Sequence, residues 1–178
     1  MAEEKEKMRA FDADSLKATC MSWERQIEKN QGDLIPIQYQ RVLSWVKDNA
    51  DYDASRENFA YGIFSDDKKV ASAVVDVIYS KSGRKWLKLL DVHLAPEIDL
   101  SFSSEKPDMK RIVDIFGAAI LGVVRLTERH PTKVTKLYGR SSSLLSFLKR
   151  FGAYLNDHGP SDDIGVSIEG RWLVIRVK

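Results

Sequence analysis

"KLYGRSSSLLSFLKRFGAYLND", residues 136–157, is the stretch that decides the fold. It predicts the end of a strand, a Gly139-Arg140 turn and then an amphipathic helix capped by serine. We expect Gly152-Ala153 to let the chain leave this helix toward a further strand. A strand, a helix and another strand in this order are typical of proteins in which helices pack on a sheet.

The segments that precede this stretch change character near residue 58. Residues 1 to about 56 predict helices, because apolar residues recur at helical spacing there. From Phe59 onward, short apolar runs alternate with polar turns, which predicts an antiparallel meander. Its three strands are expected at 59–65, 70–80 and 86–94.

The remaining segments complete a sheet with helices on it. Pro107-Asp108 predicts the start of a helix over 109–130, which is apolar nearly all round and therefore central. The strand at 133–139 should lie parallel to 86–94 through a right-handed crossover, and 166–178 predicts a hairpin. The fold class is therefore α/β, with a mixed, mostly antiparallel sheet flanked by helices. We expect one domain, made of an N-terminal helical segment, 1–58, and an α/β core, 59–178.

Composition excludes several classes of protein. The chain has 178 residues, 43% hydrophobic and 30% charged, with a formal net charge of +2. Such a balance gives no strong attraction to anionic lipid and makes nucleic acid an unlikely partner. Cys20 is the single cysteine, so no intrachain disulfide can form, which suits a cytoplasmic location. The most apolar stretch, 112–126, is too short to span a membrane, and no residue spacing indicates a metal site.

The order of these segments resembles the GNAT superfamily of acyl-CoA N-acyltransferases. "LLDVHLAPE" at 89–97 is similar to the family's fourth strand, which commonly runs into a Pro-Glu pair. The helix at 109–130 takes the place of the long helix that follows, and "SFLKRFGAYL" at 146–155 is similar to the late helix. The resemblance covers residues 59–178 and implies a GNAT-like fold. Small phage proteins are one setting in which folds of this size with a similar late helix occur.

Two departures from the family's pattern affect the function that the resemblance implies. GNAT enzymes hold the CoA pyrophosphate with a glycine-containing turn before the central helix, whereas IDLSFSSEKPDMKR at 98–111 contains no glycine. The family's usual general acid is a tyrosine of the late helix. Aligning Gly152 with the family's glycine places Leu148 at that position, and Tyr154 lies six residues further on.

Asp91 and His93 are the candidate catalytic residues. They alternate onto the same face of the strand 86–94. In a GNAT-like enzyme, a carboxylate or an imidazole at this place could take a proton from an amine, directly or through water. The alternative is that both are polar groups of a central strand that have structural hydrogen-bond partners.

Arg140, Ser141, Ser142 and Ser143 form a candidate anion-binding turn. Serine caps and the N–H groups of a helix start could converge with Arg140 on a phosphate. The alternative is a plain helix cap beside a solvated arginine. Before the central helix, Lys110 and Arg111 could attract phosphates in part, although Glu105 and Asp108 oppose them.

Taken together, these features favour a GNAT-like protein with a non-canonical or lost acetyl-CoA site, acting as a binding or regulatory module. The alternative is an active N-acyltransferase that moves an acyl group from acyl-CoA to an amine. We expect no cofactor, or acetyl-CoA if the chain is an enzyme. The expected partner is an unidentified protein, and a homodimer is one way to cover the edge of the terminal hairpin.

Overall fold

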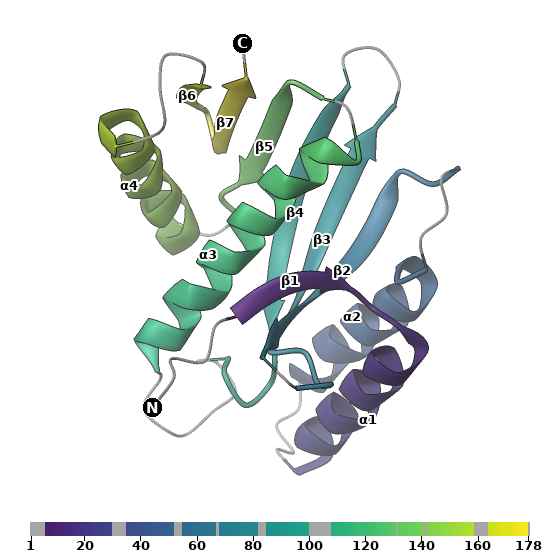
Figure 1. Ribbon diagram of the computed structural model, residues 1–178. Helices are drawn as coiled ribbons and strands as arrows, with labels where there is room; N and C mark the ends of the chain where they lie inside the picture. Colours follow the sequence, from purple (N-terminus) through teal and green to yellow (C-terminus); the bar gives the residue numbers. More distant parts are fainter. Residues whose placement is uncertain are drawn as a thin grey trace. The chain divides into compact units, whose positions relative to one another are not determined.

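The described residues form seven strands and four α-helices in the computed structural model (Figure 1). The structure describes residues 6–29, 35–51, 55–66, 68–81, 85–99, 108–130, 132–140, 142–158 and 164–177. The elements are β1 (Glu6–Ala10), α1 (Ala13–Lys29), α2 (Ile35–Asn49), β2 (Asn58–Ser65), β3 (Ala73–Ser80), β4 (Trp86–Leu94), α3 (Met109–Arg125), the 3-10 turn η1 (Leu126–Glu128), β5 (Val134–Tyr138), α4 (Ser142–His158), β6 (Ile164–Glu169) and β7 (Trp172–Val177). None of the helices in these ranges is long and apolar enough to cross a membrane.

The sheet has the predicted mixed topology. Its strand order is β1-β2-β3-β4-β5-β7-β6. The strands β4 and β5 are parallel neighbours, with Leu87 opposite Thr135 and Leu89 opposite Leu137. The β5–β7 and β6–β7 pairs are antiparallel. The predicted crossover between 86–94 and 133–139 is therefore confirmed, and so is the terminal hairpin.

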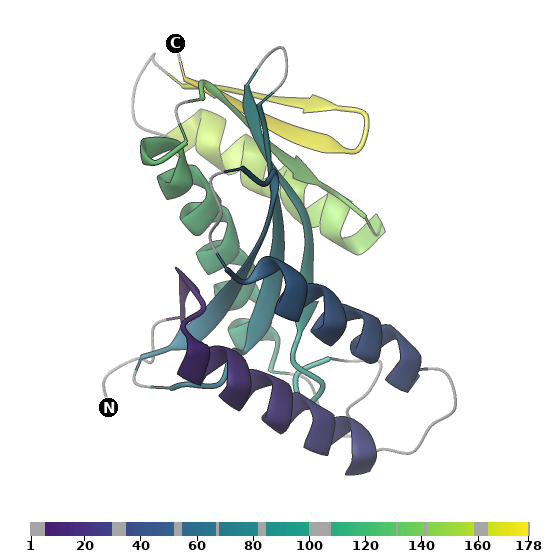
Figure 2. The same ribbon diagram turned by 90° about the vertical axis from the view of Figure 1, so that its right-hand side faces the viewer.

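The chain divides into two compact units, which are described one at a time. The first comprises residues 1–76 and 92–122. Its helices α1 and α2 lie side by side (Figure 2). Trp23 of α1 is fully buried, donates its indole N–H to the Ala71 carbonyl at 3.1 Å and meets the Tyr39 ring edge-on. Cys20 is buried in the same helix.

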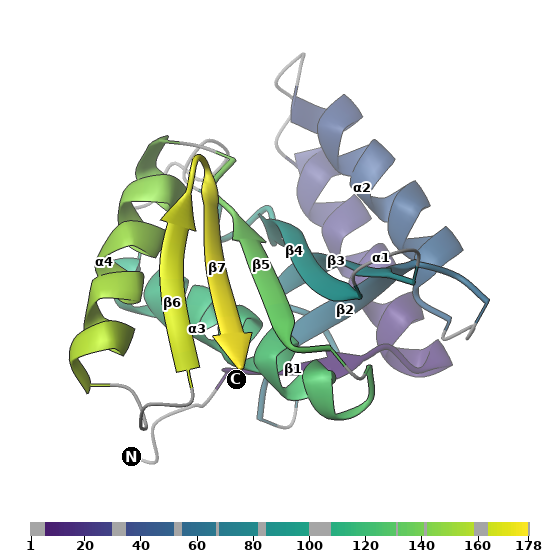
Figure 3. The ribbon, with the colours of Figure 1, turned by 90° about the horizontal axis from the view of Figure 1, so that it is seen from above.

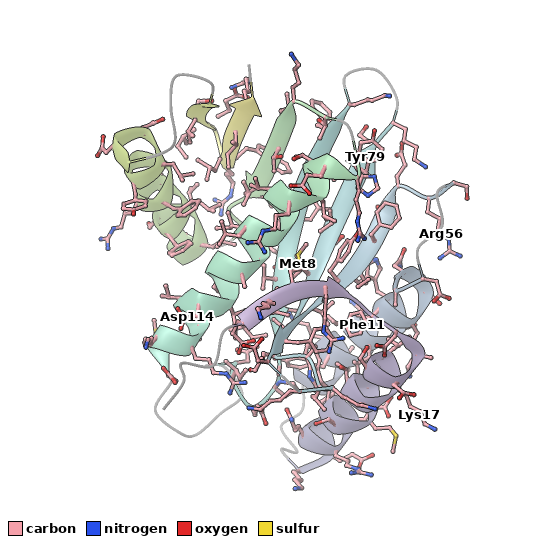
Figure 4. All side chains as sticks on the ribbon, viewed as in Figure 1. Met8, Phe11, Lys17, Arg56, Tyr79 and Asp114 are labelled. Atoms are coloured by element: carbon pink, nitrogen blue, oxygen red, sulfur yellow. The ribbon has the colours of Figure 1, made fainter. Side chains whose placement is uncertain are left out.

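A strand at the start of the chain corrects the sequence prediction, which expected helix throughout residues 1–56. Residues 6–10 form β1, which pairs antiparallel with β2, Glu6 opposite Ser65 and Ala10 opposite Tyr61. Met8 of β1 lies against α3 (Figure 4). The contact is so close that a Cβ added at Gly122 of α3 would lie 2.5 Å from the Met8 Cβ. Pairing with β2 and packing under α3 override the weak local pattern of this segment.

The second unit comprises residues 77–91 and 123–178. Strands β5, β7 and β6 lie side by side, and α4 packs against β6 and β7 (Figure 3). We predicted that the chain leaves this helix at Gly152-Ala153, but α4 continues to His158. Gly152 instead gives room for the sheet, because a Cβ there would lie 2.8 Å from the Leu173 Cδ1. This glycine therefore serves close helix–strand packing rather than a helix end.

Candidate functional site

The two groups of candidate residues around β4 and β5 meet in an ion pair. Arg140, two residues after the end of β5, donates a hydrogen bond from Nη1 to Oδ2 of Asp91 on β4. The Asp91 side chain is 17% exposed and the Arg140 side chain 64%. A predicted catalytic carboxylate and a predicted anion-binding guanidinium thus partly neutralise each other. Arg140 therefore already has an anionic partner within the protein, which a phosphate would have to replace.

Arg171 fixes the turn that presents Arg140, a role that the sequence analysis missed. Its Nε donates to the Gly139 carbonyl at 2.8 Å, and its Nη2 donates to the Arg140 carbonyl at 2.6 Å. The Gly139 N–H donates to the Arg171 carbonyl at 2.7 Å. A Cβ at Gly139 would lie 2.8 Å from the Leu145 Cβ and 2.9 Å from its Cα, so the turn requires glycine. The sequence predicted a hairpin over 166–178 but no contact between Arg171 and this turn.

The serines of the predicted anion site are only partly described. Ser142 begins α4 and is exposed. Ser141, and the side chain of Ser143, lie outside the described residues. The prediction that these serines bind an anion therefore stays a prediction.

A carboxylate caps the start of α3, where the resemblance places the CoA pyrophosphate. Oδ1 of Asp108 accepts a hydrogen bond from the Arg111 backbone N–H at 3.0 Å. The Asp108 carbonyl accepts the Ile112 N–H at 3.1 Å. Asp108 thus uses one of the orphan N–H donors of the helix and places negative charge at its positive end. The neighbouring loop, 100–107, lies outside the described residues.

Arg111, a predicted phosphate ligand, instead takes part in a polar cluster with β1. Its Nε lies 3.4 Å from Oε1 of Glu6, and its Nη2 donates to the Ser72 Oγ at 3.1 Å. The same Glu6 oxygen accepts the hydroxyls of Ser65 and Ser72, at 3.0 and 3.1 Å. The Glu6 side chain is 4% exposed and that of Arg111 32%. The positive charge of Arg111 is therefore paired with Glu6 inside the first unit. Lys110, next to it, is exposed.

Residues after β4 are fixed by α1 and α2. The Tyr39 hydroxyl donates to Oδ2 of Asp99 at 2.6 Å and lies 3.1 Å from the Leu94 carbonyl. Burial, and then the Asp99 carboxylate, raise the pKa of Tyr39 far above its usual value, so this phenol stays protonated. Glu97 accepts from and donates to the Gln26 side chain, through Oε2 and its backbone N–H, both at 3.1 Å. These two bonds join the segment after β4 to α1.

The position of the family's catalytic tyrosine is part of the core. Leu148 of α4 is 2% exposed. Tyr154, the tyrosine further along the helix, is 58% exposed. His93 lies half-buried on β4, two residues beyond Asp91. Within the described ranges, no group of three or more His, Cys, Asp or Glu residues could hold a metal ion.

Solved structures share this fold along nearly the whole chain. One is an acetyltransferase of the GNAT family from Staphylococcus aureus Mu50, with a TM-score of 0.51 and 11% identity, covering 97% of this chain and 99% of that one. Another is a putative GNAT acetyltransferase from Desulfovibrio desulfuricans, with a TM-score of 0.53 and 10% identity, covering 99% of both. A probable acetyltransferase from Staphylococcus epidermidis has a TM-score of 0.52 and 12% identity, over 95% and 97% of the two chains.

No protein-family model matches the sequence, and no curated protein matches it significantly. The likeness lies in the arrangement of the elements, at identities of 10 to 12%. The chain has the GNAT fold, as the resemblance of its segments predicted.

Proposed function

We propose that this protein is a GNAT-fold binding or regulatory module whose acetyl-CoA site is non-canonical or lost. The observation that carries the proposal is the Asp108 carboxylate at the start of α3. A pyrophosphate bound there would compete with Asp108 for the Arg111 N–H donor and would meet its negative charge. Two anions at one helix terminus repel each other, so binding of CoA at this place is unfavourable.

The environment of Arg111 supports the same proposal. Turning its guanidinium toward a phosphate would break its contacts with Glu6 and Ser72. The buried Glu6 carboxylate would then lose its cation, which costs free energy. The absence of glycine from 98–111 adds to this, because side chains hinder the approach of backbone N–H groups to a phosphate.

Leu148 also supports the proposal, because it stands where the family usually has the tyrosine that acts as the general acid. A buried leucine cannot protonate the thiolate that leaves when an acyl group is transferred. Tyr154 lies six residues along α4 and is exposed, so it does not replace the missing group.

Isothermal titration calorimetry with acetyl-CoA and CoA tests the proposal. We expect a dissociation constant weaker than about 1 mM, or no binding, for the unchanged protein. Asp108→Ser keeps a capping side chain but removes the charge, and we expect it to strengthen binding. Asp114→Ser, at an exposed position further along α3, is the matched control and should leave binding unchanged. A micromolar dissociation constant for the unchanged protein would overturn the proposal.

The second candidate function is N-acyl transfer, which the half-buried Asp91 on β4 favours. In that reaction the amine nitrogen attacks the thioester carbon, the CoA thiolate leaves, and Asp91 or a water takes the amine proton. Release of free CoA from acetyl-CoA in the presence of amines would measure it. Activity that Asp91→Asn abolishes, while the fold remains intact by circular dichroism, would establish this function in place of the first.

A further inference from the structure

The net charge of +2 hides an unequal distribution between the two units. The second unit, 77–91 and 123–178, has 14 Lys and Arg against 6 Asp and Glu, which is +8. The first unit has 14 against 20, which is −6. A chain with such asymmetry is typical of proteins whose basic part binds a polyanion. The near-neutral total, from which we expected no nucleic acid, therefore does not describe the second unit.

Three of these cations share one face of the sheet with aromatic rings. Helix α4 packs on the side of Leu173. Because side chains alternate along a strand, the other side of β7 carries Trp172 and Arg176. The registers of β7, β5 and β4 extend this side across three strands. We call it the basic sheet face; its charged and aromatic residues are Trp86, Lys88, Lys136, Tyr138, Trp172 and Arg176, and Leu90, Val134 and Val174 lie on the same side.

The cations and rings of this face are in contact with one another. The Nζ atoms of Lys88 and Lys136 lie 4.5 and 4.4 Å from the centre of the Trp86 ring. Tyr138 and Trp172 lie 4.7 Å apart, with their planes inclined by 43°. All five side chains are half-buried, so each keeps part of its surface open to solvent. The buried Trp86 Nε1 has no hydrogen-bond partner in the part of the chain that the structure describes.

Negative charge on the face is scarce. Arg176 pairs with Glu169, and this hydrogen bond lowers the pKa of that carboxyl. Lys88 and Lys136 make no ion pair within 4 Å of any residue in the described ranges, although the charge of Lys136 also helps to lower the pKa of Glu169. Their charges are therefore available to an anionic ligand, and the rings beside them offer planar apolar surface.

We infer that the basic sheet face binds single-stranded nucleic acid. The lysines would move from the Trp86 ring to contact phosphates, and bases would then stack on that ring and on the Tyr138–Trp172 pair. The acidic side chains of a peptide would satisfy the charges but are not flat rings that could stack, and a duplex keeps its bases stacked inside. This inference goes beyond the proposed function and uses no residue of the α3 terminus.

Fluorescence anisotropy with labelled 20-nucleotide oligo(dT) and oligo(U) tests it. We expect binding to both probes that weakens with KCl, with a log–log slope of about −0.7 for each phosphate contacted. Lys88→Gln/Lys136→Gln should weaken binding about tenfold or more and reduce the slope by about 1.4. Lys149→Gln/Arg150→Gln removes two exposed cations of the same unit from α4 and should have little effect. A difference between the probes would identify DNA or RNA as the ligand.

Tryptophan fluorescence separates stacking from charge attraction alone. Oligo(dT) should quench the emission, and most of the quenching should be lost in Trp86→Phe/Trp172→Phe but kept in Trp45→Phe, which changes α2 of the first unit. Three results would overturn the inference: no binding at 50 mM KCl, equal loss in the two double charge variants, or displacement by poly-glutamate at the same charge concentration. Displacement by poly-glutamate would show that the face binds polyanions in general, including acidic proteins.

Discussion

The carboxylate of Glu6 and the guanidinium of Arg111 join β1 to the first turn of α3, with 3.4 Å between Oε1 and Nε. The same oxygen accepts two serine hydroxyls. The sequence offered Arg111 as a phosphate ligand, but in the structure its guanidinium is paired with Glu6 of β1.

Glu6→Gln should destabilise the protein by about 1–2 kcal/mol, because Arg111 loses its charged partner while the hydroxyls keep an acceptor. The midpoint of urea unfolding measures this. Lys7→Gln is the matched control on the same strand. Its ion pair with Asp66 is largely exposed, 61% and 46%, so the change should cost less than about 0.5 kcal/mol. Equal losses in the two variants would contradict a special role for the cluster.

Gly139→Ala should destabilise the protein by about 1–3 kcal/mol. The added methyl would lie within 3 Å of the Leu145 Cβ and Cα, and the turn is held on its other side by Arg171. Gly117→Ala provides the contrast, because a Cβ there meets nothing within 4 Å and the position is inside α3. That variant should gain about 0.5–1 kcal/mol from helix propensity. Thermal unfolding followed by circular dichroism gives both values.

The stability should fall as the pH decreases from about 7 to 5. Burial, and then the charges of Lys81 and Arg129, lower the pKa of His130, which packs on the Tyr79 ring at 4.5 Å. A histidine whose pKa is lower in the folded state binds protons more readily when unfolded. The contribution of His130 to the free energy of unfolding is therefore complete above the pKa of the unfolded state, about 6.5, and is lost as the pH falls from there through the lower pKa of the folded state. His130→Gln should flatten the dependence of the melting temperature on pH across this range; an unchanged slope would exclude His130 as its source.

The Cys20 thiol should be unreactive in the native protein. It is 5% exposed, and burial raises its pKa, so little thiolate is present and access is restricted. Ellman's reagent should label it only as urea unfolds the chain, with a midpoint that matches circular dichroism. Rapid labelling without urea would indicate local opening of α1.

A homodimer through the terminal hairpin remains a prediction. Strand β6 ends the sheet, and Ile168 on it is 39% exposed. An edge strand offers unpaired backbone groups to a second copy. Light scattering at micromolar concentration should give twice the chain mass, and Ile168→Lys should restore the monomer. A monomer at that concentration for the unchanged protein would remove the idea.

Local patterns in the sequence predicted β4, β5 and α4 well, because apolar alternation and helical spacing persist over whole elements there. They failed for β1, whose Glu-Lys-Met-Arg-Ala has no clear alternation and becomes a strand by pairing with β2. The continuation of α4 through Gly152 was missed for a similar reason. The space that this glycine provides is needed only because Leu173, a residue of a later strand, packs there.

The candidate site was predictable in its residues but not in its pairings. The sequence indicated Asp91 and Arg140 separately, for proton transfer and for anion binding. Their ion pair joins residues 49 apart in the chain. It follows from the parallel register of β4 and β5, which no local pattern contains. The capping role of Asp108 was easier to predict from the sequence, since an aspartate directly before a helix is a common N-cap.

The contact of Arg171 with the Gly139–Arg140 turn also has a consequence for the order of events during synthesis. Strand β5 and the turn after it leave the ribosome well before β7. Strand β7 is the antiparallel neighbour of β5, and Arg171, which holds the turn, comes directly before β7. The second unit therefore cannot complete its sheet until β7 has left the ribosome. Until then, the ring of Tyr138 lacks its partner Trp172, and a released chain truncated before residue 171 should be sensitive to proteases within β5 and α4.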